Sequence, residues 1–240
     1  MRLVVLALIS VILTLSGAKG KASAGLRMTP VLWAWERRED LRFLGEAKTV
    51  AFYAGILTLT RDSVVVEPRR NPLLLARRTR RIAVVRIQTN HPRLDAAQRR
   101  ETVDAIAHLF RNAEELQIDF DASASERAFY RALLFDVRRE IDAPLTITAL
   151  ASWCMDDRWM GGLPIDDAVP MLFRMGDDTH AIRARLARGE DFREPSCRRS
   201  IGVSLDEPLR IAPRGRRVWV FNSDRWTEDA WKRAERFASR

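Results

Sequence analysis

The sequence predicts an α/β protein: a compact (β/α)8 barrel of the TIM type that spans residues 25–240 as a single domain and follows a signal peptide. Eight short apolar segments rich in β-branched and aromatic residues are spaced along the chain, and helical periodicity separates several of them. Alternating strands and helices favour a parallel sheet, and eight parallel strands are the number that closes such a barrel. The 240 residues, 47% of them hydrophobic, are enough to bury one sizeable core.

Residues 1–24 have the layout of a secretory signal peptide. Arg2 precedes an apolar run over residues 3–15, and the small residues 22–24 form a site after which we expect cleavage. The alternative is an uncleaved membrane anchor, but a spanning helix needs roughly 20 apolar residues and this run is shorter. The sequence therefore predicts an exported protein, periplasmic or secreted, with no stable membrane anchor after cleavage.

The expected elements follow one another along the remainder of the chain. Strands are predicted over residues 30–35, 49–57, 81–88, 116–121, 145–152, 168–175, 200–205 and 217–222. Helices are predicted over residues 96–112 and 126–141, and shorter ones over 39–44, 180–188 and 227–238. Ser123 and Glu126 form a capping-box signature for the helix over 126–141.

Two features limit this assignment. Residues 60–81 are irregular and fit a hairpin better than a helix. A chain of this length is near the lower end for an eight-stranded barrel, so we expect short loops or one or two missing helices. An open doubly wound sheet is the structural alternative, although no G-x-G-x-x-G pattern follows the first strand.

The mature chain is basic because of arginine. Loss of residues 1–24 removes Arg2, Lys19 and Lys21 and no acidic residue, so the formal net charge falls from +9 to +6. The arginines are spread along the whole chain, whereas a nucleic-acid footprint clusters on one face. We therefore expect no nucleic-acid partner, while anionic glycans or lipid head groups fit a basic exported protein.

The two cysteines, Cys154 and Cys197, are expected to form a disulfide in an oxidising compartment. Their spacing fits no zinc motif, and no histidine lies near them in the sequence. The chain also has no G-x-S-x-G, H-E-x-x-H, P-loop or C-x-x-C motif. The sequence thus predicts neither a metal site nor a cofactor.

Two carboxylates mark the fourth expected strand. Side chains alternate across a strand, so Asp119 and Asp121 share one face, and Leu116, Ile118 and Phe120 share the other. In a barrel the apolar face meets the helices, and the aspartates point into the lumen at the carboxyl-terminal end, where such enzymes carry their chemistry. Each charge raises the proton affinity of the other, so one carboxyl group can serve as an acid.

The alternative role for Asp119 is structural. Arg86 lies on the neighbouring expected strand, and buried charges are normally paired, so Asp119 would then neutralise Arg86 inside the barrel. Asp121 lies nearer the mouth of the barrel and is therefore the better catalytic candidate.

Other expected strand ends add polar and aromatic side chains to the same rim. They are Trp35 and Glu36, Trp153 and Asp156, Arg174, Asp206 and Glu207, and Asn222 and Trp226. Carboxylates that converge with tryptophans suit a sugar, because its ring faces stack on aromatic rings and its hydrolysis commonly uses two carboxyl groups. Each residue also has a simpler explanation: Trp35 as core, Asp156 as a turn cap, and the 206–208 segment as a strand end.

A resemblance to a known family rests on five stretches. These are VLWAWERREDLRFL, LQIDFDASASERAFYRALL, LTITALASWC, AVPMLFRMG and CRRSIGVSLDEP. Together they resemble a bacterial family of exported proteins with a glycoside-hydrolase-like barrel whose activity is not established. A weaker similarity is to chitinase-type barrels, whose fourth strand ends in D-x-D-x-E with the Glu as general acid. Asp119 and Asp121 match the two aspartates, but Ser123 stands at the Glu position.

The first functional hypothesis is an exported glycoside hydrolase acting on a carbohydrate or polysaccharide. Asp121 would act with Glu36 or Glu207 as the acid and the nucleophile or base, while Asp119 tunes Asp121 and Arg86 balances the charge. The expected substrate-binding residues are Trp35, Arg86, Trp153, Asp156, Arg174, Asp206, Asn222 and Trp226. The second hypothesis is a non-catalytic barrel of the cell envelope that binds a glycan or a protein partner. A third is a basic surface that docks an anionic polymer.

Overall fold

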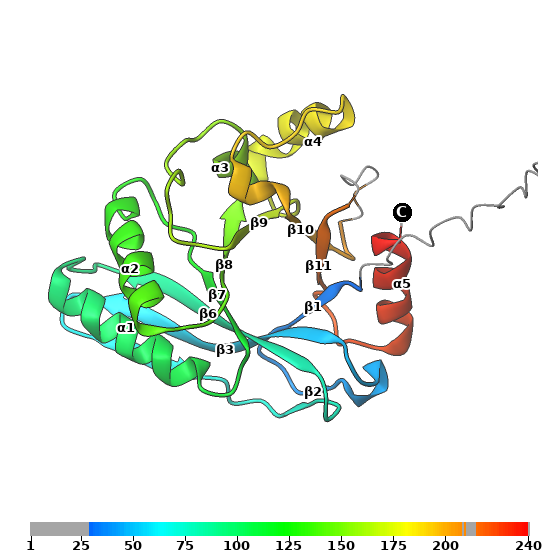
Figure 1. Cartoon of the computed structure of the whole chain (residues 1–240), viewed down its shortest axis with the longest axis horizontal. Coiled ribbons are helices and arrows are strands. Elements are labelled where there is room, and N and C mark those ends of the chain that lie inside the picture. Colours follow the sequence, from blue (N-terminus) through cyan, green and yellow to red (C-terminus); the bar gives the residue numbers. More distant parts are fainter. Residues whose placement is uncertain (1–28, 208, 210–214, 240) are drawn as a thin grey trace, which may run out of the picture.

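The computed structural model describes residues 29–207, 209 and 215–239, which contain a closed α/β barrel (Figure 1). Eight parallel strands form its wall, in the order β1-β11-β10-β9-β8-β7-β6-β3. β1 pairs with both β11 and β3, which closes the sheet and excludes the open doubly wound alternative. The strands are β1 (Val31–Ala34), β3 (Thr49–Thr60), β6 (Arg80–Asn90), β7 (Glu115–Asp119), β8 (Leu145–Leu150), β9 (Asp167–Met171), β10 (Ser200–Ser204) and β11 (Arg217–Phe221). The eight strands expected from the sequence are thus confirmed, while the expected signal peptide lies outside the described residues.

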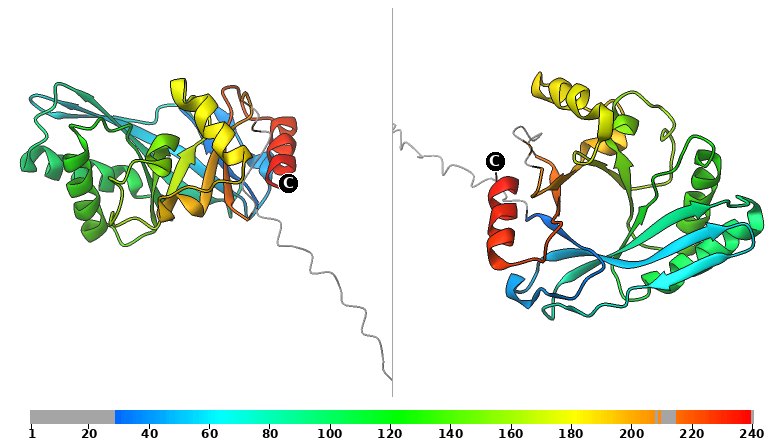
Figure 2. Two further views of the ribbon diagram at one scale, coloured as in Figure 1. Left: turned by 90° about the horizontal axis from the view of Figure 1, so that it is seen from above. Right: turned by 180° about the vertical axis from the view of Figure 1, so that it is seen from behind.

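The helices cover the outside of the barrel unevenly (Figures 1 and 2). They are α1 (Ala96–Phe110), α2 (Arg127–Glu140), α3 (Ala151–Met155), α4 (Thr179–Ala187) and α5 (Glu228–Ala238). α1 packs on α2 and on the β3–β6 side, α4 contacts α3, and α5 contacts β11. The connections from β1 to β3 and from β3 to β6 contain no α-helix, as the short chain led us to expect. None of the described helices combines the length and apolarity that crossing a bilayer requires.

The connections without an α-helix use short strands instead. β4 (Val64–Pro68) runs antiparallel to β3, which confirms the expected hairpin, and β5 (Leu73–Leu74) pairs with β2 (Glu39–Asp40). The helix expected over residues 39–44 is wrong, because β2 is followed only by a 3-10 turn, η1 (Arg42–Leu44). Asp40 accepts hydrogen bonds from the backbone and the guanidinium of Arg42, a local alternative to helical hydrogen bonding.

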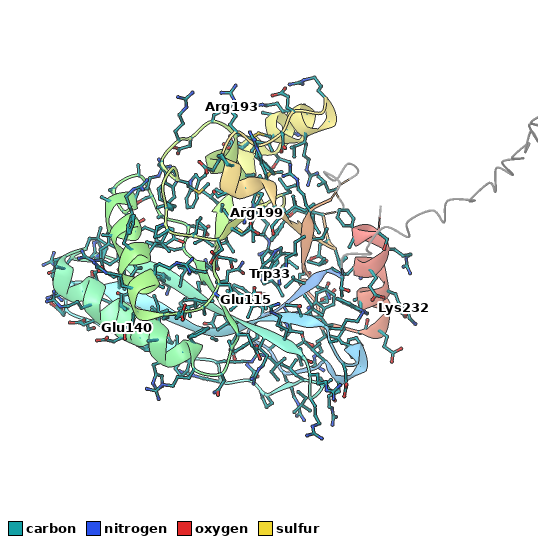
Figure 3. The ribbon with its side chains drawn as sticks, in the orientation of Figure 1. Trp33, Glu115, Glu140, Arg193, Arg199 and Lys232 are labelled. Carbon is teal, nitrogen blue, oxygen red and sulfur yellow. A yellow bond between two sulfur atoms is a disulfide. The ribbon has the colours of Figure 1, made fainter. Side chains whose placement is uncertain are left out.

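The strands separate two apolar clusters. Leu116, Ile118 and Phe120 belong to the outer cluster between strands and helices, as the alternation along β7 predicts. The lumen holds a second cluster around Trp33 and Trp219, whose ring centroids lie 5.4 Å apart. The indole N–H of Trp33 donates a 2.7 Å hydrogen bond to Gln117 Oε1 across the lumen. Figure 3 places Trp33 toward the middle of the ring of strands.

Charged side chains close the amino-terminal end of the lumen. Glu115, almost fully buried, forms ion pairs with Arg80 at 2.6 Å and with Arg217 at 3.2 Å. Nearby in the sheet, Asp167 accepts a hydrogen bond from the Ser200 hydroxyl, while its Oδ1 is buried without a hydrogen-bond partner in the described structure. Burial raises the pKa of Asp167 to about 6, although Ser200 and Arg217 favour the charged form. Its ionised form is therefore poorly compensated.

The expected disulfide between Cys154 and Cys197 is confirmed, with Cα atoms 5.8 Å apart. Cys154 lies on α3, and Cys197 lies on the 3-10 helix η3 (Pro195–Arg198) just before β10. The bond therefore encloses the segment that contains β9 and α4. Both cysteines are fully buried in the outer cluster.

We expect the double variant Cys154→Ala/Cys197→Ala to unfold more easily than the native protein. The bond closes a loop with a sequence separation of 43, and its loss should lower the unfolding free energy by about 4 kcal/mol in the chain-entropy description. Urea denaturation of both proteins, with and without reductant, measures the difference. Reductant should destabilise the native protein and leave the variant unchanged; equal sensitivity of the two proteins would contradict this account.

Asp167→Asn should stabilise the protein at neutral pH. An Asp whose pKa is raised by folding binds more protons in the folded state, so stability falls as pH rises from about 4 to about 6. The loss amounts to roughly 3 kcal/mol for a shift of about two units, and the amide avoids it. Urea denaturation at about pH 4.5 and about pH 7.5 should show a stability gain for the variant that grows with pH. A stability gain that does not change with pH would contradict this explanation.

Candidate functional site

A pocket of about 480 Å³ opens at the carboxyl-terminal ends of the barrel strands. Its wall comes from the ends of β1, β6, β7, β8, β9 and β11 and from the segment between β9 and α4. It brings together five of the residues expected from the sequence, which are Trp35, Arg86, Asp119, Asp121 and Arg174. The alternation of side chains along β6 and β7 thus correctly predicted that Arg86, Asp119 and Asp121 face the same space.

Asp119 is held rigidly at the base of the pocket. Its Oδ2 lies 2.9 Å from Arg86 Nη1, and its Oδ1 accepts a 2.7 Å hydrogen bond from the Thr148 hydroxyl. Only 5% of the Asp119 side chain is exposed. The ion pair with Arg86 expected from the sequence is thus present, and both oxygens of Asp119 have a partner.

Asp121 differs from Asp119 in exposure and in partners. Its side chain is 47% exposed, and the shortest contact between Asp121 and Arg86 is 4.0 Å, from Oδ2 to Nη2. The surrounding protein atoms limit its hydration and, with the charge of Asp119, raise the pKa of Asp121, while Arg86 opposes the shift. Among the two aspartates, Asp121 is therefore the one suited to carry a proton.

Aromatic rings form much of the remaining wall. Phe173 and Phe221 stack with centroids 5.5 Å apart and planes inclined by 6°. Trp35 meets Tyr53 at 5.3 Å and the edge of Phe221 at 6.4 Å. Trp33 lies below them, 6.3 Å from Phe173. Flat rings beside carboxylates are the combination that accommodates a sugar ring.

Glu36 and Glu207, the expected partners of Asp121, do not line the pocket. Glu36 Oε1 accepts hydrogen bonds from the backbone and side chain of Asn71 and from the Arg70 N–H. Burial works against ionisation of Glu36, but these hydrogen bonds outweigh it and lower its pKa. Glu207 accepts the backbone N–H of Arg174 with both carboxylate oxygens at 3.2 Å. Both glutamates thus hold loops in place.

The other expected binding residues are also engaged elsewhere. Trp153 packs edge-on against Trp159 within the outer cluster because the chain turns into α3 after Leu150. The buried indole of Trp226 donates to the Trp33 carbonyl. The remaining three each have a local partner: Asp156 pairs with Arg185 and Arg193, Asp206 accepts from Ser204 and Ser223, and Asn222 donates to the Arg225 carbonyl.

The pocket also contains residues that sequence reasoning missed. Thr148 and Phe221 occupy inward positions of strands that were correctly expected, so the alternation rule could have found them. Phe173 and Asp178 lie beyond the end of β9, in the turn and in the 3-10 helix η2 (Gly176–Asp178). Phe173 lies within the segment expected to be a strand, residues 168–175, whereas Asp178 lies beyond it, where no strand periodicity applies.

No family model, curated protein or solved structure matches this chain. The resemblance to exported proteins with a glycoside-hydrolase-like barrel therefore stays a prediction. A fold of this kind hosts many chemistries, so the residues within it must carry the argument.

Gly202→Ala should disturb the floor of the pocket. A Cβ at this position would lie 2.9 Å from Trp33 Cη2 and 3.2 Å from its Cζ3. Trp33 is confined by Gln117 and Trp219, so the ring has to shift, and overpacking of this kind costs about 1–3 kcal/mol. Thermal unfolding and the fluorescence of the variant measure both effects, and unchanged stability would show that the lumen is looser than the contacts indicate.

Proposed function

We propose that this chain is an exported glycoside hydrolase built on a (β/α)8 barrel of the TIM type whose first two connections contain no α-helix. One observation supports the proposal most. A single pocket, lined in part by aromatic rings, holds the fixed carboxylate of Asp119 and the carboxyl group of Asp121, whose pKa is raised. Hydrolysis of a glycosidic bond generally needs an acid for the leaving oxygen and a carboxylate that stabilises the positively charged sugar ring. The disulfide supports export, because such bonds persist in oxidising compartments.

Asp121 is the proposed general acid. Its raised pKa and its place at the pocket mouth suit donation of a proton to the glycosidic oxygen. Asp119, whose two oxygens are held by Arg86 and Thr148, would place its carboxylate next to the reacting carbon. Asp178 is the third carboxylate of the described pocket wall, and it replaces Glu36 and Glu207 as the candidate base. Trp35 and Phe173 provide the stacking surfaces.

A second candidate function is glycan binding without catalysis. In the D-x-D-x-E pattern of chitinase-type barrels the acid is the last residue, and Ser123 occupies that position here. The next carboxylate, Glu126, is occupied as the cap of α2, where it accepts hydrogen bonds from Ser123 and Thr89. These bonds overcome the effect of burial and lower the pKa of Glu126, so it does not replace the missing acid.

Asp121→Asn should abolish hydrolysis and leave binding within about threefold, since the amide keeps the shape but cannot donate the proton. The assay measures new reducing ends released from a panel of cell-envelope and extracellular polysaccharides. Asp104→Asn, the same substitution on the exposed face of α1, is the matched control. Because the acid must be protonated, activity should fall as pH rises through the pKa of Asp121. Saturable binding by all three proteins without any release would favour the binding module.

A further inference from the structure

Arg174 is the basic side chain of the described pocket wall that has no acidic partner. Arg86, the other basic residue there, is already paired with Asp119. The Arg174 guanidinium lies over the Phe221 ring, 5.1 Å from its centroid. Within residues 29–207, 209 and 215–239, no carboxylate, Asp178 included, forms an ion pair with this guanidinium. Asp206 is near enough to feel this positive charge but forms no ion pair with it, so the exposed guanidinium is available to a ligand in the pocket.

The backbone around Arg174 is arranged to present this side chain. Arg174 has φ of 52°, in the left-handed region that residues other than glycine seldom adopt. Its N–H donates to both oxygens of Glu207, and Glu207 in turn lies 3.5 Å from Arg183 Nη2. An unusual backbone conformation held by a dedicated carboxylate at a pocket rim is typical of a functional position. This arrangement also explains why Glu207 does not line the pocket.

Stacking on Phe221 leaves the edge of the guanidinium available. Phe221 is itself backed by Phe173, so the ring beneath Arg174 is fixed. A guanidinium that is held flat by an aromatic ring presents paired N–H groups in a fork that matches a carboxylate. A sugar ring stacked on Trp35 would bring its substituents to this fork.

Building on the proposed function, we propose that the substrate is an acidic saccharide whose anionic substituent is bound by Arg174, with Glu207 as the positioning residue. The anionic group is an oxyanion: the carboxylate of a uronic acid or a sulfate ester. The carboxylate fits the planar fork more closely, and we take the uronic acid as the substrate class.

The test is a titration of the intrinsic tryptophan fluorescence, to which Trp33 and Trp35 of the pocket contribute, in the full chain and in its variants, with uronate oligosaccharides. The probes are oligogalacturonide, oligoglucuronide and oligomannuronate, each compared with its fully methyl-esterified form and with a sulfated neutral oligosaccharide. In the native protein, a free acid should bind at least about tenfold more tightly than its ester, as expected for a charge-assisted bidentate contact. Arg174→Gln should remove this preference without changing the affinity for the ester.

Two further variants separate recognition from general effects. Arg100→Gln removes the same charge from an exposed position of α1 outside the pocket, and it should keep the preference. Glu207→Gln should reduce the ratio of acid to ester affinity while the affinity for the ester stays unchanged, an outcome that a merely destabilised loop would not give. Tighter binding of the sulfated probe with the same dependence on Arg174 would assign the site to sulfate esters instead of uronates.

The outcomes distinguish this inference from the proposed function. If the native protein binds acid and ester equally, or if Arg174→Gln retains the preference, the acidic substrate is wrong. Hydrolysis of a neutral polysaccharide, lost in Asp121→Asn, would in that case leave the glycosidase standing. Failure to bind or cleave any saccharide would overturn both.

Discussion

The closure of the sheet by β1 is the constraint on which the remaining structure depends. β1 spans only Val31–Ala34, yet it is the strand that joins β11 to β3 and turns an open ribbon into a ring. Once the ring is closed, every inward side chain shares one narrow lumen, and polar groups there must find partners among each other. The hydrogen bond between Trp33 and Gln117 meets that requirement across the lumen.

The side chains that fill the lumen change in character from one end to the other. Glu115 and its arginines fill the amino-terminal end, and Trp33 and Trp219 fill the middle. Ionisable groups return at the carboxyl-terminal end, where Asp119 is paired and Asp121 is only partly so. Glu115 at the amino-terminal end is thus held by two arginines, whereas Asp121 at the carboxyl-terminal end is half exposed and open to a ligand.

Much of this arrangement could be predicted from the sequence, because it depends on local patterns. The period of two along β7 placed Asp119 and Asp121 inward and Ile118 outward, and the neighbouring strand supplied Arg86. The predictions that failed concern contacts between segments that are distant in the sequence. Glu36 and Glu207 follow strands as expected, but their oxygens are taken by the N–H groups of Asn71 and Arg174, and no local pattern shows that these loops approach.

Strand ends were the other source of error. Trp153 was expected at the rim, and the early start of α3 turns it into the outer cluster. In the same way β9 stops at Met171, so Phe173 and Arg174 reach the pocket from a turn. A strand and a short apolar helix look alike over a few residues, so their boundary is set by tertiary packing.

The disulfide also restrains one side of the pocket. The segment that it encloses carries Met171, Phe173, Arg174 and Asp178, which is one whole side of the pocket. That side is tied at its start to the chain leaving β8 and at its end to the chain entering β10. In a reducing environment both ties depend on non-covalent packing alone. The shape of this side of the pocket is thereby linked to the redox state of one disulfide.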